Sequence, residues 1–465
     1  MKKIFLFSIP AHGHTNPMLP VAAKLVDRGN KVYFFSFKEF EERINNTGSE
    51  FIECDSFLPK LNESELAGLK SVSTTEMTIQ DIRTTLNMDK FLEEKFKAIK
   101  PDVVYTDSVC FWGKLNALKH NVPMVVSTST FAFNQMSSQY MKYSPKELAD
   151  MIFGLPKISK ELKKLRPYGY NVKNALSLVQ SDNKTDSIVY TSRRFQPFAE
   201  SYSDHYLFVG PSVFSDKTPD KEKERPLVYI ALGTVINERP DFYKKCIDAL
   251  KNEDVDVIIS CGLTTDIKLL GELPAKIKVF PRVDQPDVLS KADVFITHCG
   301  MNSVSESLYM ATPMLLYPQT SEQFAVARRA REIGAGIIME DDSVEGIASS
   351  VKKILENDSY SKAAKACCDD FRACPGSEGA AEFIENAPHK SNGIDLIDEV
   401  NKKTGLFQII FWAIIVSVML IVGFSAGWIY IWMIGIPAGV LSYPIAKFAQ
   451  KLIYNKIKTK YQKNY

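Results

Sequence analysis

The sequence lacks a strong excess of charge of either sign. Its 57 Lys and Arg residues nearly balance its 55 Asp and Glu residues, and the formal net charge of the 465-residue chain is +2. A chain without a broad basic surface has no global electrostatic reason to bind a polyanion. We therefore predict no nucleic-acid partner.

The sequence also lacks cysteine pairs of the CxxC type. A chain of this length needs no disulfide scaffold, so reduced thiols in a cytosolic compartment are the expected state. Cys367, Cys368 and Cys374 precede His389, but their spacing fits no standard zinc pattern, and no metal site is predicted there. The cysteines are Cys54, Cys110, Cys246, Cys261, Cys299, Cys367, Cys368 and Cys374.

The N-terminus lacks the long apolar core and the small-residue cleavage site of a signal peptide. The segment MKKIFLFSIPAHGH has two lysines and only a short apolar run. A first buried strand explains this run more simply. We therefore expect the bulk of the protein in the cytoplasm.

Charge is absent from Leu406 to Ala446, a stretch of 41 residues. As a helix this stretch would be about 60 Å long, twice the roughly 30 Å hydrocarbon core of a bilayer. The residues Gly423 to Gly427 offer a tight turn near its middle. The pattern predicts a transmembrane hairpin of two helices, roughly 406–423 and 428–446. A buried helical hairpin in a soluble fold is the alternative.

Lysines flank both ends of this predicted hairpin. Lys402 and Lys403 lie in the expected juxtamembrane linker 389–405, and the tail 447–465 holds six lysines and no acidic residue. Because positive residues prefer the cytoplasmic side, both ends should face the cytoplasm. The protein is thus predicted to be membrane-anchored with a basic cytoplasmic tail. That tail either lies on an anionic lipid surface or is simply solvated.

The remaining chain alternates strands and helices in two rounds. Near-continuous apolar strands separated by helices indicate an α/β fold with parallel sheets covered on both faces. We predict an N-terminal domain 1–214, a charged linker 215–226 and a second domain 227–388. The predicted strands are Lys3–Ile9, Lys31–Phe37, Asp102–Tyr105, Pro123–Ser127, Leu227–Leu232, Val255–Ser260, Ile277–Phe280, Asp293–Thr297 and Pro313–Tyr317.

The segment 298–323, HCGMNSVSESLYMATPMLLYPQTSEQ, carries the clearest functional signal. A strand runs through His298 and a glycine into a helix opened by Asn302 and Ser303, with Glu306 one turn later. The N–H groups and positive dipole end of such a helix attract phosphate. The Glu306 carboxylate could bind ribose hydroxyls. Ser303 and Glu306 also have capping-box spacing, which is the structural alternative.

This segment resembles the nucleotide-sugar signature of UDP-dependent glycosyltransferases of family 1, in the macrolide glycosyltransferase branch. The resemblance extends from about Lys2 to about Ala387 and is dense in AHGHTNPMLP and from PRVDQPDVL through TSEQ. It implies a GT-B fold, in which two Rossmann-like domains face a cleft. The first would bind the acceptor, the second the UDP-sugar. The predicted membrane hairpin is not part of the usual family pattern.

The resemblance assigns the catalytic roles to His14 and Asp107. His14 belongs to the GHxxP element, which we expect in a loop between the first strand and a helix over Pro17–Arg28. It would accept the proton of the acceptor hydroxyl, and Asp107, at the end of VVYTD, would orient and stabilise its imidazolium. Asp102, at the start of that strand, is expected to serve a turn.

The resemblance also assigns the donor site. His298, Gly300, Asn302 and Ser303 would hold the diphosphate, together with a second small-residue loop. Glu306 would bind the ribose, while an acid–amide pair would hold the sugar. No DxD motif occurs at a strand end, so no metal or other cofactor is predicted, and the UDP-sugar is a co-substrate. The remaining donor-site residues are Gly233, Thr234, Val283, Gln285, Glu322 and Gln323.

The expected reaction is transfer of a hexose, with glucose the expected sugar, to a hydroxyl with inversion. The acceptor is either a small apolar aglycone such as a macrolide, phenol or terpenoid, or a membrane lipid of the sterol, diacylglycerol or carotenoid-alcohol type. In the resembled family the region of residues 136–180 helps to form the acceptor pocket, so the resemblance implies that it holds acceptor specificity. A non-catalytic sugar-nucleotide-binding membrane protein would need no base, and a UDP-sugar epimerase would need no acceptor pocket or anchor.

Overall fold

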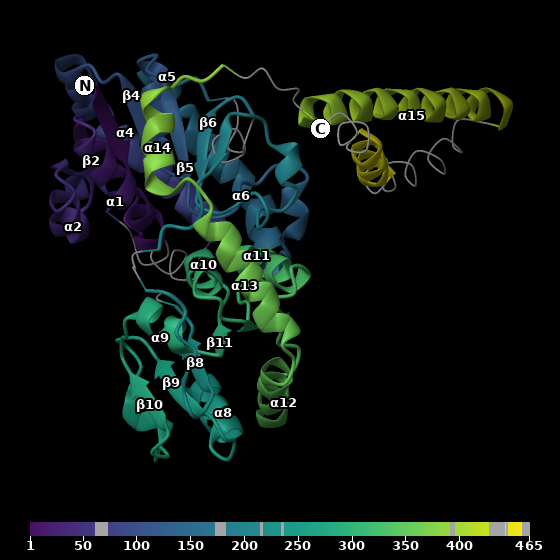
Figure 1. Cartoon of the computed structure of the whole chain (residues 1–465). Coiled ribbons are helices and arrows are strands. Elements are labelled where there is room, and N and C mark those ends of the chain that lie inside the picture. The colour runs from purple at the N-terminus through teal and green to yellow at the C-terminus, as the bar shows by residue number, and fades with distance from the viewer. Residues whose placement is uncertain are drawn as a thin grey trace. The chain divides into compact units, whose positions relative to one another are not determined.

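A computed structural model describes residues 1–60, 73–172, 183–213, 217–233, 237–390, 396–426, 442 and 445–457. They form two compact units. The first comprises Met1–Pro197 with Tyr206–His389, and the second comprises Phe198–His205 with Lys390–Tyr465 (Figure 1). Both predicted α/β halves fall within the first unit, so the boundaries expected at residues 214 and 227 stay predictions.

The first half is built on a parallel sheet of seven strands within the described residues, in the order β3-β2-β1-β4-β5-β6-β7. Central strands such as β4 are buried on both faces, which explains their continuous apolar sequences. The strands are β1 Lys3–Phe7, β2 Lys31–Ser36, β3 Glu50–Glu53, β4 Val103–Asp107, β5 Met124–Thr128, β6 Asp186–Val189 and β7 Tyr206–Phe208.

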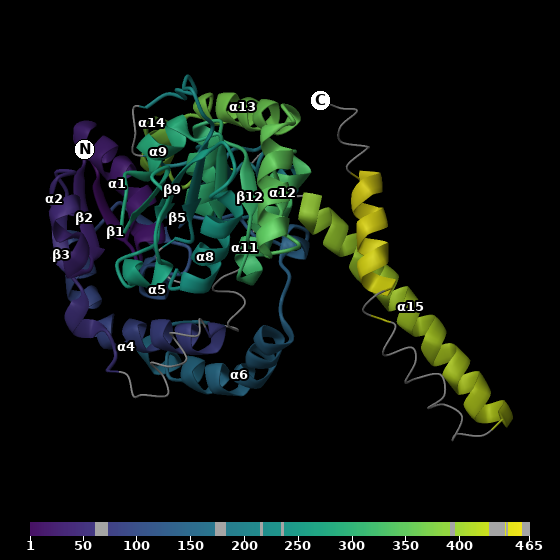
Figure 2. The same cartoon turned by 90° about the horizontal axis from the view of Figure 1, so that it is seen from below.

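Helices cover this sheet, and α6 runs side by side with α4 (Figure 2). α6 begins with a capping box between Ser144 and Glu147, with Pro145 as its first residue, an arrangement that favours a helix start. The helices and 3-10 turns of this half are α1 His12–Asp27, η1 Lys38–Phe40, α2 Glu41–Asn45, η2 Asp55–Phe57, α4 Thr74–Ile99, α5 Phe111–Lys119, η3 Ser137–Tyr140, α6 Pro145–Lys163 and η4 Arg166–Tyr168.

The second half repeats the architecture with a parallel sheet of six strands among the described residues, in the order β10-β9-β8-β11-β12-β13. Its strands are β8 Leu227–Ala231, β9 Asp256–Ser260, β10 Ile277–Phe280, β11 Val294–Thr297, β12 Met314–Leu316 and β13 Gly336–Ile338. Its helices are α8 Pro240–Leu250, η6 Ile267–Leu270, α9 Gln285–Lys291, α10 Met301–Tyr309, α11 Ser321–Glu332, α12 Val344–Leu355, α13 Ser359–Arg372 and α14 Gly376–Glu385.

Every strand predicted from the sequence is present, with its ends shifted by at most two residues. The helix predicted over Pro17–Arg28 begins earlier, at His12, so His14 lies in its first turn and not in a loop. The reason is local, because the carbonyl of Ala11 accepts the N–H groups of both His14 and Thr15 and starts the helix before Pro17.

The two halves share packing as well as chain connections. α14, the last helix of the second half, packs on α1 and buries Ala380, Ala381 and Ile384 in the core of the first half. Arg28 forms ion pairs with Glu378 and Glu385 at 2.5 and 2.8 Å, which fasten this return helix.

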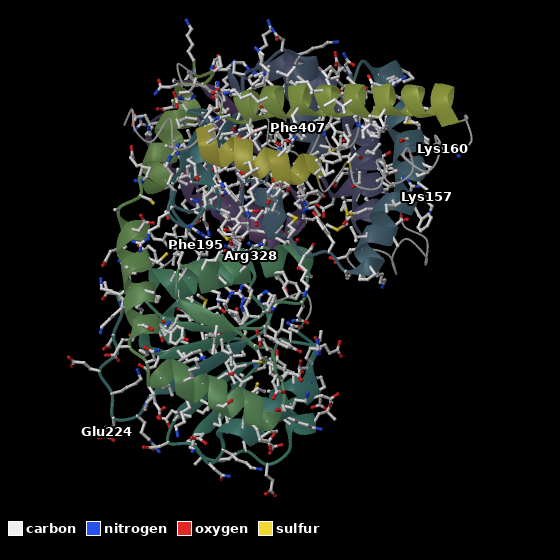
Figure 3. The ribbon with its side chains drawn as sticks, turned by 90° about the vertical axis from the view of Figure 1, so that its right-hand side faces the viewer. Lys157, Lys160, Phe195, Glu224, Arg328 and Phe407 are labelled. Carbon is white, nitrogen blue, oxygen red and sulfur yellow. The ribbon has the colours of Figure 1, made fainter. Side chains whose placement is uncertain are left out.

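Contacts from the first half also enter the second. The Phe195 ring stacks edge-on against Phe371 of α13, and its carbonyl accepts a hydrogen bond from Arg329 of α11. The neighbouring Arg328 lies over the ring of Tyr140 at 4.4 Å. Phe195 and Arg328 mark this junction in Figure 3.

The second unit contains η5 Ala199–Ser201, α15 Leu396–Ala426 and a helix over residues 445–457. The Tyr454 ring packs edge-on against Phe198, and its hydroxyl donates a 2.7 Å hydrogen bond to Glu200. The C-terminal helix is thereby joined to the segment that links β6 and β7 in the sequence.

α15 contains one segment, Lys402–Met419, that is long and apolar enough to cross a membrane by length and composition. The helix begins inside the expected linker 389–405 and continues through Gly423–Ala426, where a turn was expected. Gly is tolerated in apolar helices, which explains the continuation. Most of the second predicted helix, 428–446, lies outside the described residues, so the hairpin stays a prediction.

Candidate functional site

His14 and Asp107 meet at the carboxyl edge of the first sheet. β1 and β4 are neighbours in register, so the turn after β1 and the last residue of β4 lie side by side. His14 Nδ1 is 2.9 Å from Asp107 Oδ2. The Asp107 side chain is fully buried, while that of His14 is 29% exposed. The predicted base and its carboxylate partner are therefore in direct contact.

Two further residues at this place were missed by the sequence interpretation. Ser129, which follows β5, has its hydroxyl 3.2 Å from His14 Nδ1. It follows the strand next to β4, so the rule that parallel strand ends share an edge could have found it. Asp81 of α4 acts electrostatically on both His14 and Asp107. Nothing in the sequence around Asp81 signals this position.

The surroundings of His14 favour its protonated form. Burial acts to lower the pKa of His14, but the charge and hydrogen bond of Asp107, with smaller contributions from Glu322 and Asp81, raise that pKa to about 9. The protonated, neutral form of Asp81 is favoured, because burial and the neighbouring Asp107 charge raise its pKa well above the usual value. The resting site thus stores a proton on His14 that must leave before His14 can act as a base.

The start of α10 excludes the capping-box alternative. The N-cap of α10 is Gly300, and the helix begins at Met301, which makes Ser303 the third helical residue. Ser303 cannot therefore cap the helix with Glu306. The first-turn N–H groups of Asn302 and Ser303 belong to the positive end of the helix, where an anionic group is stabilised.

Glu306 joins a hydrogen-bonded group formed by predicted donor-site residues. Gln285 Nε2 lies 2.6 Å from Glu306 Oε2 and 3.3 Å from Ser303 Oγ. The Tyr229 hydroxyl, also missed from the sequence, donates to Gln285 Oε1 at 3.1 Å. Burial raises the pKa of Glu306 to about 7, although the Gln285 hydrogen bond opposes this shift. Glu306 is therefore poised to ionise near neutral pH.

The His298 ring packs against Gly233 and Gly300, where any residue larger than glycine would collide with it. A Cβ atom at Gly233 or at Gly300 would come within 2.5 Å of the His298 ring, and Gly233 has a left-handed φ of 77°. Burial lowers the pKa of His298 to about 4, despite a hydrogen bond with the Ala231 carbonyl. Its Nδ1 is buried without a partner among the described residues. A buried polar atom of this kind is suited to a bound ligand.

The acid–amide pair begins α11. Glu322 is exposed, and its charge acts to raise the pKa of His14, so the predicted sugar-binding acid lies near the predicted base. Gln323 Oε1 accepts the N–H of Gln319 at 2.8 Å, which is the polarity expected at a helix start. Asn302 of α10 approaches Gly13, since its Nδ2 would lie 3.6 Å from a Cβ there. Residues of both halves thus surround one place.

The other residues singled out from the sequence are Val283, Thr234 and Cys299. Val283 is partly buried and packs against the core of the second half, and Thr234 lies outside the described residues. Cys299 is buried with a left-handed φ of 67°, a conformation that favours glycine. In the described part of the chain, no three His, Cys, Asp or Glu side chains gather as a metal site would require.

Comparison with known proteins identifies the family. The profile of "Erythromycin biosynthesis protein CIII-like, C-terminal domain" matches residues 244–386. NDP-glycosyltransferase YjiC of Bacillus subtilis (strain 168) is 31% identical over 402 residues, which cover 84% of this chain and 99% of YjiC. This chain belongs to the NDP-glycosyltransferase family. It is an enzyme that uses a nucleotide-sugar as co-substrate, so the predicted family and enzyme class are confirmed, and the non-catalytic alternative is wrong.

Two other similarities agree with this assignment. The uncharacterized UDP-glucosyltransferase YojK of the same strain is 28% identical over 399 residues, which cover 83% of this chain and 98% of YojK. The crystal structure of the glycotransferase of kitacinnamycin has a TM-score of 0.69 at 22% identity, covering 83% of this chain and 98% of that one. The likeness confirms the GT-B fold. About one sixth of this glycosyltransferase has no counterpart in these relatives.

We expect Asp107→Asn to move the pH dependence of kcat/KM to lower pH. In the unmodified enzyme the base form of His14 increases as pH rises toward about 9, so kcat/KM should rise over that interval. Removing the Asp107 charge removes the largest stabilisation of the imidazolium, so the pKa of His14 falls and the rise begins earlier, while the maximal rate drops.

Asp102→Asn is the matched control, because Asp102 lies at the other end of β4 and accepts the N–H of Lys3 at 2.8 Å. Its profile should retain the unmodified midpoint. Equal midpoints for the Asp107 variant and the unmodified enzyme would contradict the assigned pairing.

We expect Glu306→Ala to weaken UDP binding roughly 10- to 100-fold, the loss typical of a hydrogen bond to a charged group. Because the pKa of Glu306 is about 7, UDP binding to the unmodified enzyme should weaken from about pH 8 to about pH 6 as the carboxylate is protonated. Calorimetric titration with UDP measures both effects.

The control for this prediction is Glu345→Ala, at an exposed position in the first turn of α12. It should bind UDP like the unmodified protein. If Glu306→Ala keeps the full affinity and the same pH dependence, Glu306 does not bind the ribose.

Proposed function

We propose that this enzyme transfers glucose from UDP-glucose to a hydroxyl group of an apolar acceptor, with inversion at the anomeric carbon and without a metal ion. The observation that carries the proposal is the 2.9 Å contact between His14 and the buried Asp107, with Glu322 of the other half near it. Binding alone requires no such base.

The proposed reaction is a direct displacement. Asp107 holds the Nδ1 side of His14, which leaves Nε2 for the acceptor hydroxyl. The acceptor oxygen attacks the anomeric carbon, its proton passes to His14, and the bond from that carbon to the UDP oxygen breaks. The leaving diphosphate is stabilised by the first turn of α10 and by the neighbouring His298, whose Nδ1 has no partner among the described residues.

The donor assignment has separate support. Gln285, Ser303 and Glu306 form one hydrogen-bonded group beside the start of α10, which suits a ribose next to a diphosphate. YojK is named as a UDP-glucosyltransferase, which favours UDP-glucose. The pair Glu322 and Gln323 would hold the sugar hydroxyls.

Two acceptor classes remain. A small apolar aglycone agrees with the family profile, whose description names erythromycin biosynthesis. A membrane lipid alcohol agrees with the C-terminal segment of this chain. We favour an acceptor that dissolves in the bilayer, because a tethered enzyme meets such molecules at a high effective concentration.

We further propose that residues 406–446 anchor the enzyme as a transmembrane hairpin, with the catalytic halves in the cytoplasm. Only 6% of the Lys402–Met419 segment is buried, so it is not a covered core helix in this structure. Its exposed side chains include Leu406, Ile409, Ile410 and Ile414, which favour hydrocarbon over water. The lysines on both sides favour a cytoplasmic position for both ends.

We expect His14→Ala to lower the transfer rate by roughly 10²- to 10⁴-fold while UDP still binds, the loss typical of a general base. The measurement is UDP release by the full-length enzyme in nanodiscs with UDP-glucose and either a lipid extract or a panel of phenols and macrolides. The product is identified by mass. A glycosylated lipid would establish a membrane-lipid glucosyltransferase, whereas products from soluble aglycones alone would make the anchor a tether. Near-normal turnover by the variant would refute the catalytic role of His14.

We expect the double substitution Ile409→Lys with Ile414→Lys to release the enzyme from membranes during alkaline carbonate extraction. Each lysine costs about 2.5–3.5 kcal/mol at the centre of a spanning helix. Leu263→Lys, at an exposed position of the second half, is the control and should remain in the membrane. Full extraction of the unmodified protein would contradict the anchor.

A further inference from the structure

α6 exposes apolar side chains that are large enough to mark an interaction surface. Phe153 is 78% exposed and Ile152 is 62% exposed, and Leu148 and Leu155 are about half exposed. Leu148, Ile152 and Leu155 recur at helical spacing and therefore share one side of α6. Contiguous apolar side chains on a protein surface commonly mark a place where a partner or a membrane binds.

The acidic side chains of α6 are bound to partners within the fold. Glu147 accepts the N–H of Ser144 at 2.7 Å in the capping box. Asp150 accepts hydrogen bonds from the start of α4, at 2.9 and 3.2 Å. Glu161 is buried and contacts Lys164 at 2.8 Å. Each carboxylate on α6 is thus partnered within the fold.

The exposed charges of α6 are therefore positive. Lys157, Lys160 and Lys163 are exposed, and Lys157 and Lys160 point away from the body of the protein (Figure 3). Tyr143 before the helix and Tyr168 after it are also exposed. Apolar side chains beside lysines, with tyrosines at the ends, are typical of helices that lie in the interface of an anionic membrane.

The opposite face holds α6 firmly to α4. Ile158 and Leu162 are buried in a cluster with Ile79 and Ile82 of α4. Gly154 lies so close to Thr75 that a Cβ would come 1.9 Å from the threonine hydroxyl oxygen. The exposed face is consequently presented by a rigid pair of helices, one of which also carries Asp81 beside the catalytic residues.

We propose that α6 docks on an anionic bilayer surface. Ile152 and Phe153 enter the boundary between headgroups and acyl chains, and Lys157, Lys160 and Lys163 contact lipid phosphates. This docking deepens the proposed function and rests on it in one respect, because it would bring the catalytic halves to a bilayer that holds the proposed apolar acceptor. The proposed contact between α6 and the bilayer is distinct from the proposed spanning segment in α15.

The test follows a fluorescent label on the full-length enzyme. Ser159→Cys, on the exposed face of α6, is labelled with an environment-sensitive dye, and Ser349→Cys, an exposed serine of α12, is the matched control. Each protein is reconstituted in phosphatidylcholine vesicles with or without phosphatidylglycerol, and some lipids carry a nitroxide quencher. The unsubstituted chain gives the background, because seven of its eight thiols are buried.

Docking predicts quenching of the label at position 159 and not at position 349, and only with phosphatidylglycerol. Replacing Lys157 and Lys160 by Gln should lower the docked-to-undocked ratio roughly fivefold for each lysine, whereas Lys362→Gln on α13 should leave it unchanged. Phe153→Ser should lower the ratio as well, because it removes the most exposed apolar anchor.

Three outcomes would overturn the proposal. They are no quenching at position 159 in vesicle-bound enzyme, equal quenching at both positions, or a label at position 159 that is already shielded from water without vesicles. The last outcome would assign this face to another part of the same chain. Because no sugar donor is used, a negative result here differs from absent UDP release, which would refute the proposed reaction.

Discussion

The contact between His14 and Asp107 depends on one constraint, the adjacency of β1 and β4 in a parallel sheet. Parallel strands end at the same edge, so the residue that closes β4 lies beside the turn that follows β1. The helix that starts at His12 then presents the imidazole to the buried carboxylate. A change of strand order would separate the two groups completely, whereas loop changes elsewhere would leave them in contact. The second sheet repeats the same geometry, and it brings His298 and the start of α10 to the corresponding edge.

The two edges differ in their electrostatics, and the difference suits their tasks. At the first edge a buried carboxylate raises the pKa of His14 to about 9, whereas at the second edge burial without a charged partner lowers the pKa of His298 to about 4. The first histidine is thus prepared to hold a proton and the second to lack one. An anionic donor placed between them would favour the protonated form of both histidines, and for His298 it would oppose the effect of burial.

Much of the fold could be predicted from the sequence, because strands buried on both faces appear as continuous apolar runs. The strands β3, β6, β7 and β13 were missed, since each lies in only a short apolar stretch of the sequence. His14 and Asp107 were found through a motif and a strand end. Ser129 was missed although it follows a predicted strand, and Asp81 could not be found, because it reaches the site from a helix whose placement depends on tertiary packing. The prediction that His14 lies in a loop was wrong, because the helix starts through the carbonyl group of Ala11, a residue with no capping side chain.

The return of α14 to the first half has a consequence for the integrity of the molecule. The chain passes from the first half to the second through the charged segment 215–226, and it passes back before α14. Ala380, Ala381 and Ile384 belong to the core of the first half, and Glu378 and Glu385 hold Arg28. A protease that cut the charged segment would therefore produce two polypeptides but still one particle. The halves would remain associated through a helix that one polypeptide donates to the core of the other.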